Sequence, residues 1–164
     1  MASNNEGRAR YQAKSRTLLR EFCDKMRTER KMNKKAIAKK YSIEADTFRS
    51  WMRDSHCGAP TLLKHGLLIA DILFPYPFGC DAPESIFEPS VPELLRAFRR
   101  EQKMTLASFA RYAQVDPNTV FLWEHGKGSP SLNKHFPVIG EFLEWAIAKD
   151  IQRKIRTKVK TVKE

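Results

Sequence analysis

Basic and polar residues between positions 33 and 53 have the spacing of two short helices with their charged side chains outside. An arginine offers a planar fork of donors that fits a guanine edge, whereas a lysine is a point charge suited to phosphates. The pattern favours contact with nucleic acid, and a merely solvated charged surface is the alternative interpretation. Phosphate contacts are expected from Asn33, Lys34, Lys35, Lys39 and Lys40. Base contacts are expected from Ala45, Asp46, Arg49, Ser50 and Arg53.

The stretch from 103 to 130, KMTLASFARYAQVDPNTVFLWEHGKGSP, has the same organisation. Its apolar residues recur at helical spacing on both sides of a break at 114–116, which predicts two helices and a tight turn. Thr105 and Asp116 are the expected N-caps. Pro117 suits the first helical position, because an N–H at that position has no acceptor within the helix and proline loses nothing by lacking it. The expected contacts are Asn118 and Phe121 to bases, and Thr105 and Lys127 to phosphates.

The stretch 103–130 resembles the XRE-type, phage-repressor helix-turn-helix family. The resemblance is carried by Thr105, Phe109, Ala110, Val115, Asp116, Thr119, Val120, Trp123, Glu124, His125, Gly126, Pro130, Ser131 and Leu132. It implies a recognition helix in the major groove of double-stranded DNA and helix N-termini against phosphates. There are two departures from the family pattern. Gln114 stands where a turn glycine able to take positive φ is usual, and Phe121 with Leu122 stands where polar side chains are usual.

The motif occurs twice in the chain. An offset of 72 residues matches Ile37, Ala38, Ile43, Thr47 and Trp51 to Phe109, Ala110, Val115, Thr119 and Trp123. Similar matches continue at offsets of 76 upstream and 70 downstream. The repeat predicts an all-α fold of two tandem repressor-like helix-turn-helix domains joined by a proline-rich linker.

The predicted organisation has five segments. Residues 1–14 form a flexible basic arm, 15–73 the first domain, 74–92 the linker, 93–148 the second, XRE-like domain, and 149–164 a basic C-terminal tail. Each domain is near the lower size limit for an independent core, so docking of one on the other is expected to matter. The linker contains enough aromatic residues to pack along one or both domains.

The net charge of +11 indicates a polyanionic partner. The basic residues are concentrated in 1–73, with 16 Lys/Arg against 8 Asp/Glu, and in 149–164, with 7 against 2. The three cysteines are widely spaced, which predicts neither a disulfide framework nor a zinc site. His65 and His135 are expected to be polar residues at helix starts, so no metal and no cofactor is expected. No signal peptide or membrane span is visible, and the cytoplasm is the expected compartment.

Two parts of the sequence have more than one interpretation. The second domain is nearly neutral, so Phe121 either contacts thymine methyl groups or is buried against another protein surface, which is slightly favoured. In the tail, Ile147, Ile151, Ile155, Val159 and Val162 form a stripe at helical spacing. The tail is therefore a seam for a partner helix, a phosphate-binding arm or a solvated extension.

A sequence-specific transcription regulator that binds double-stranded DNA is the leading hypothesis. A homodimer through the second domain or the tail is expected if only the first domain reads bases. One alternative is an accessory DNA-binding factor of a phage or plasmid, acting in replication, excision or conjugative transfer. Another is an interaction protein or anti-activator on the same fold. An enzyme is not expected, because the sequence has no phosphate-cradling glycine loop and no nucleophile motif.

Overall fold

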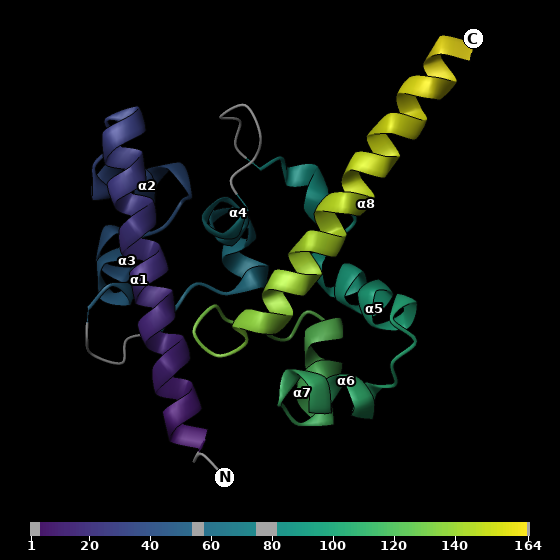
Figure 1. Ribbon diagram of the computed structural model, residues 1–164, viewed down its shortest axis with the longest axis horizontal. Helices are drawn as coiled ribbons and strands as arrows, with labels where there is room; N and C mark the ends of the chain where they lie inside the picture. The colour runs from purple at the N-terminus through teal and green to yellow at the C-terminus, as the bar shows by residue number, and fades with distance from the viewer. Residues whose placement is uncertain (1–3, 54–57, 75–81, 164) are drawn as a thin grey trace.

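The computed structural model describes residues 4–53, 58–74 and 82–163, and within them the chain is almost entirely helical (Figure 1). The elements are α1 (Asn4–Arg30), α2 (Lys34–Lys40), α3 (Ala45–Trp51), α4 (Leu62–Leu73), the 3-10 helix η2 (Glu84–Phe87), α5 (Val91–Glu101), α6 (Leu106–Ala113), α7 (Pro117–Glu124) and α8 (Phe136–Lys163). No β-strand forms in these described ranges, so the prediction of an all-α chain is confirmed.

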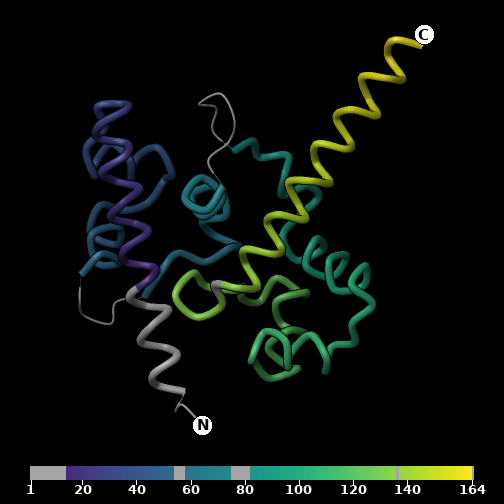
Figure 2. The backbone as a smooth tube through the Cα atoms, viewed as in Figure 1, coloured from purple at the N-terminus to yellow at the C-terminus, as the bar shows by residue number. Residues whose placement is uncertain are grey.

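Two hydrophobic cores share α4. We call α1–α4 the first unit and α5–α8 the second unit. The first core lies among α1, α2 and α3, and its buried residues include Leu19, Phe22, Ile37, Phe48 and Trp51. The second core lies among α5–α8, and its buried residues include Leu95, Phe98, Phe109, Val120, Trp123 and Phe142. Helix α4 and the first turns of α8 pass between α1–α3 and α5–α7 (Figure 2).

Opposite faces of α4 belong to different cores. Leu68 packs in the first core, whereas Leu62, Ile69 and Ala70 are buried in the second. The expected boundary at residue 73 therefore does not separate two independent cores. Because neither core is closed without α4, the two units stabilise each other, in line with the small size of each.

The described part of the linker is packed on the helices. Ile86 is fully buried in the second core, and the Phe87 ring lies against Gly66 of α4. A Cβ at Gly66 would be 2.9 Å from this ring, so glycine permits the close approach. Asp71 of α4 accepts hydrogen bonds from the Tyr41 hydroxyl and the Ala82 amide at 2.6 and 2.8 Å. The packing of the linker along the helices agrees with expectation, while its segment 75–81 is outside the described residues.

Three segment boundaries differ from the predicted ones. The expected flexible arm is helical from Asn4, because its residues up to 14 include many strong helix formers such as Glu, Arg, Ala and Gln. The expected linker ends early, because Ser90 caps α5 and Pro92 lies in its first turn. The expected tail is the continuation of α8, because no glycine or proline occurs between 141 and 163 to end that helix.

Left-handed backbone recurs at matched positions of the two units. The positive φ angles are 56° at Lys31 and 57° at Lys103, 56° at Ser42 and 58° at Gln114, and 86° at Gly58 and 118° at Gly128. The first two pairs are 72 residues apart and the third is 70 apart. Gly126 also has a positive φ, 74°, and the residue of the first unit that the offset matches to it lies outside the described residues. The turns α2–α3 and α6–α7 therefore have the same conformation without a glycine in either.

Candidate nucleic-acid interface

The α2–α3 pair is fixed by a cap and a tight turn. Asn33 Oδ1 accepts the Ala36 amide at 2.8 Å and caps α2. After Ser42, the Ile43 amide donates to the Ala38 carbonyl at 2.8 Å and closes the turn. Ala38 is buried and small, which lets the two helices approach each other. The outward surface of α3 is therefore not packed in the core of the first unit.

Arg49 is held on the outward surface of α3 by its neighbours. Its Nη2 lies 2.8 Å from Asp46 Oδ1, and its Nε donates to the Ala45 carbonyl at 3.4 Å. The two side chains are 56% and 93% exposed, so solvent screens this ion pair and it is weak. The guanidinium is therefore oriented along α3 yet can exchange Asp46 for a base edge at little energetic cost.

A cavity of about 540 Å³ lies beside Arg49, where α1, α2 and α3 meet. It is lined by Cys23, Asp24 and Arg27 from α1, by Met32, Asn33, Lys34 and Lys35 around the start of α2, and by Ala45 and Arg49 of α3. Arg27, an exposed residue whose Nη2 is 3.4 Å from Asp24 Oδ1, was not among the expected site residues. Its position four residues after Cys23 puts it on the same side of α1 as Cys23, but only the packing of α1 against α2 and α3 brings it to the cavity.

The structure places most of the expected contacts of the first unit on the outside. Exposed side chains are those of Lys34, Lys35, Lys39, Lys40, Asp46, Arg49 and Arg53. Ala45 and Ser50 are half-buried, and the Ser50 hydroxyl donates to the Thr47 carbonyl at 2.7 Å. Because the Asn33 oxygen caps α2, a contact from this residue to DNA would use its amide nitrogen. The role of each residue toward DNA stays a prediction.

The α6–α7 pair has the predicted caps. The Thr105 hydroxyl accepts the Ser108 amide at 3.1 Å, and Asp116 Oδ1 accepts the Asn118 amide at 2.8 Å. Pro117 is the first residue of α7, as expected. Asn118 and Lys127 are exposed. These contacts define the start of α7 and place its N-terminus on the surface of the second unit.

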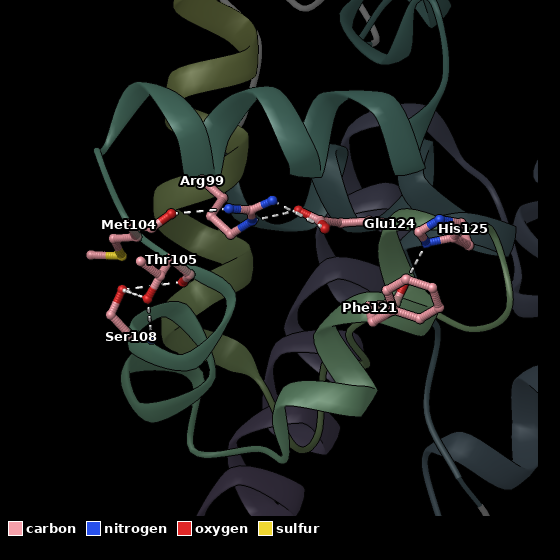
Figure 3. A network of polar contacts seen from close by, with 7 residues as sticks. All are labelled: Arg99, Met104, Thr105, Ser108, Phe121, Glu124 and His125. Atoms are coloured by element: carbon pink, nitrogen blue, oxygen red, sulfur yellow. Dashed lines mark hydrogen bonds and ion pairs between the residues drawn. The ribbon is translucent and has the colours of Figure 1, made fainter.

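Phe121 and His125 form an exposed aromatic pair on α7 (Figure 3). Their ring centroids are 4.0 Å apart and the rings are nearly parallel, at 28°. His125 Nδ1 donates to the Phe121 carbonyl at 2.7 Å, which fixes the imidazole over the phenyl ring. Phe121 is 44% exposed, so a large apolar surface occupies the expected base-reading position of α7.

A buried ion pair ties the end of α7 to α5. Arg99 Nε lies 2.7 Å from Glu124 Oε1, and Arg99 Nη1 donates to the Met104 carbonyl at 3.0 Å (Figure 3). The Arg99 and Glu124 side chains are only 13% and 4% exposed. The guanidinium therefore fixes α7 relative to α5 and to the loop before α6. Sequence reasoning did not assign this pair, because its members are 25 residues apart.

The outward surfaces of the two units differ in the chemistry of their side chains. Side chains of the first unit bring lysines and arginines to one area, whereas the second unit offers an apolar ring pair and an amide. Within the described residues, no group of three or more His, Cys, Asp or Glu side chains is placed to hold a metal ion. No helix in the described part of the chain is both long and apolar enough to cross a membrane.

One family model matches this chain. A model described as helix-turn-helix, of the XRE type, matches residues 95–134, from α5 through α7 to the segment before α8. The match identifies this stretch as an XRE-type helix-turn-helix segment and indicates a DNA-binding regulator. Nothing among the curated proteins and nothing among the solved structures matches the chain.

Proposed function

We propose that the protein is a sequence-specific regulator that binds double-stranded DNA through two helix-turn-helix units in one chain, without catalysing a reaction. The second unit contains the segment that matches the family model. The first unit, on this proposal, is a second copy of the same module and supplies most of the charge. Its lysines contact phosphates, and Arg49 and Arg53 contact base edges.

The observation that carries the proposal is the shared backbone of α2–α3 and α6–α7. Ser42 and Gln114 both adopt left-handed conformations, which residues other than glycine, asparagine and aspartate seldom do. Both turns are also closed by the same backbone bond, from Ile43 to Ala38 at 2.8 Å and from Val115 to Ala110 at 2.9 Å. A chance resemblance of two unrelated helix pairs would not reproduce an unfavoured conformation at the same offset.

Selection of duplexes from a random-sequence pool, followed by competition binding, tests the proposal. We expect a preferred duplex, and we expect Arg49→Ala to reduce the preference for it over random DNA by about 5- to 150-fold, since one bidentate contact is worth about 1–3 kcal/mol. Lys25→Ala is the matched control. Lys25 is exposed on α1 but, two residues after Cys23, it lies on the opposite side of that helix from the cavity. An unchanged preference in Arg49→Ala would refute the base contact.

A second candidate function has one specific observation in its favour. The exposed Phe121 ring, stacked on His125, is unusual for a surface that reads polar base edges. It supports an interaction protein in which α7 contacts another protein while α3 contacts DNA. Both functions place DNA on the first unit, and they differ in the partner of α7.

A further inference from the structure

The two units meet at a reciprocal pair of backbone hydrogen bonds. The Leu62 amide donates to the Pro130 carbonyl at 2.9 Å, and the Leu132 amide donates to the Pro60 carbonyl at 3.0 Å. Thr61 and Ser131 form an antiparallel bridge between these bonds. Pro60 is 70 residues before Pro130, and Leu62 is 70 residues before Leu132. Exchanging the two units therefore turns one hydrogen bond into the other. Such reciprocity characterises an interface with two-fold symmetry.

The same symmetry extends from the bridge to α3 and α7. The Trp51 and His65 rings are edge-to-face with centroids 4.9 Å apart, at 75°. The Trp123 and His135 rings are also 4.9 Å apart, at 77°. Each histidine accepts through Nδ1 from the amide of the bridge residue of its own unit, at 3.5 Å from Thr61 and 3.1 Å from Ser131. Both outward-facing helices are thus connected to the bridge through one tryptophan and one histidine.

We infer that one chain is an intramolecular pseudo-dimer, with a local two-fold axis at the Thr61–Ser131 bridge, and that it binds a single duplex at two half-sites in inverted orientation. The inference rests on the proposed DNA-binding function and specifies its target. A duplex has local two-fold axes of its own, so a protein with this symmetry binds half-sites that run in opposite directions.

The two half-sites have different sequences. Helix α3 presents Asp46 and Arg49, with Arg53 just after its end, whereas α7 presents Asn118 and Phe121 in the corresponding area. Forked arginine donors fit guanine, an asparagine amide fits adenine, and a phenyl ring fits a thymine methyl group. The target is therefore an imperfect inverted repeat whose first half is recognised by polar contacts and whose second half is recognised largely by apolar ones.

A cross-link tests the symmetry without DNA. Thr61→Cys and Ser131→Cys, introduced together in the full chain, place two thiols across an antiparallel bridge, where Cα separations suit a disulfide. We expect oxidation to link the two positions within one monomer, as shown by peptide mapping. Thr61→Cys with Lys149→Cys is the control, because Lys149 lies far along α8. A 61–131 link found only between two chains would refute the intramolecular axis.

Stoichiometry and half-site orientation test the DNA part. With the duplex selected above, we expect one chain per duplex by sedimentation and two protected half-sites by footprinting. Reversing one half-site, or inserting 5 bp between the two, is expected to lower affinity ten-fold or more, to that of one half-site alone. Two chains per duplex, one protected half-site, or indifference to reversal would overturn the inference while leaving sequence-specific DNA binding by the first unit intact. Failure to bind any selected duplex would instead overturn the proposed function.

Discussion

Cys23 Sγ lies 3.8 Å from Met52 Sδ inside the first core, at the place that the Arg99–Glu124 ion pair occupies in the second. Cys23 directly follows Phe22 and Met52 directly follows Trp51, just as Arg99 follows Phe98 and Glu124 follows Trp123. The first helix and the end of the third helix are thus joined by a sulfur contact in one unit and by charges in the other. An apolar pair needs no compensating hydrogen bonds, whereas a buried ion pair needs both partners.

Removal of one partner of the Arg99–Glu124 pair is expected to destabilise the protein strongly. Glu124→Ala leaves the buried Arg99 guanidinium without its carboxylate, at a cost of about 3–5 kcal/mol in the free energy of unfolding. Arg99→Cys combined with Glu124→Met reproduces the sulfur pair of the first unit, and we expect it to recover part of this loss. Urea unfolding followed by circular dichroism measures both. The Asp46→Ala control breaks an exposed pair and should cost less than about 1 kcal/mol.

The left-handed turn residue of the second unit limits stability. Gln114 has φ 58°, which a glycine adopts without a Cβ clash, so we expect Gln114→Gly to raise the free energy of unfolding by about 0.5–1 kcal/mol. Gln102→Gly is the control, because Gln102 has φ −76° and gains nothing from glycine. Thermal unfolding compares the variants. An equal loss of stability in both would contradict strain at Gln114.

Acid is expected to weaken the fold through the histidines beside the bridge. Burial, with a smaller contribution from Lys134, lowers the pKa of His135 to about 4, and burial also lowers the pKa of His65. Between pH 6.5 and about 4 the unfolded chain binds more protons than the folded one, so stability falls as pH falls through this window. The expected loss from His135 is on the order of 2 kcal/mol.

Replacement of His135 tests this pH dependence directly. His135→Gln keeps a polar side chain but cannot gain a proton, so its free energy of unfolding should change less than that of the wild type between about pH 7 and 4. Urea unfolding at a series of pH values measures the slope. A slope identical to that of the wild type would show that the acid sensitivity arises elsewhere.

Replacement of Phe121 tests whether α7 contacts DNA or another protein. If α7 contacts the second half-site, Phe121→Ser should weaken DNA binding while the oligomeric state stays the same, and this is the result that we expect, because serine cannot replace an apolar contact with a thymine methyl group. Sedimentation velocity and gel shift on the same samples measure the two properties. Lys25→Ala, exposed on α1, is the control. A changed oligomeric state with unchanged DNA affinity would instead favour contact between α7 and another protein.

The exposed end of α8 is expected to contribute to the salt dependence of DNA binding. Helix α8 extends beyond the body (Figure 1), and Lys158, Lys160 and Lys163 are exposed along it. Their replacement by glutamine should reduce the slope of log affinity against log salt by up to about 0.9 for each lysine that binds a phosphate. Lys25→Gln is the control. An unaltered slope would favour the partner-helix interpretation, which Ile155→Ser and Val159→Ser would then test by sedimentation.

Local signals in the sequence were sufficient for α6, α7 and their caps. Thr105, Asp116 and Pro117 occupy the predicted cap positions because a cap involves residues only two or three apart. The inward positions of Phe109, Val120 and Trp123 follow from helical periodicity alone. The spacing also placed Arg49 on the outside, since its position on α3 depends on the same period.

Only the tertiary structure decided how the units are joined. The hydrogen bonds between Leu62 and Pro130 and between Leu132 and Pro60 are made by backbone groups. Nearly every residue carries these groups, so no side-chain pattern in the sequence predicts such bonds. The double role of α4, the contribution of Arg27 to the cavity and the Arg99–Glu124 pair likewise depend on segments distant in sequence. Short-range chemistry determined each helix, and long-range packing determined which surfaces meet.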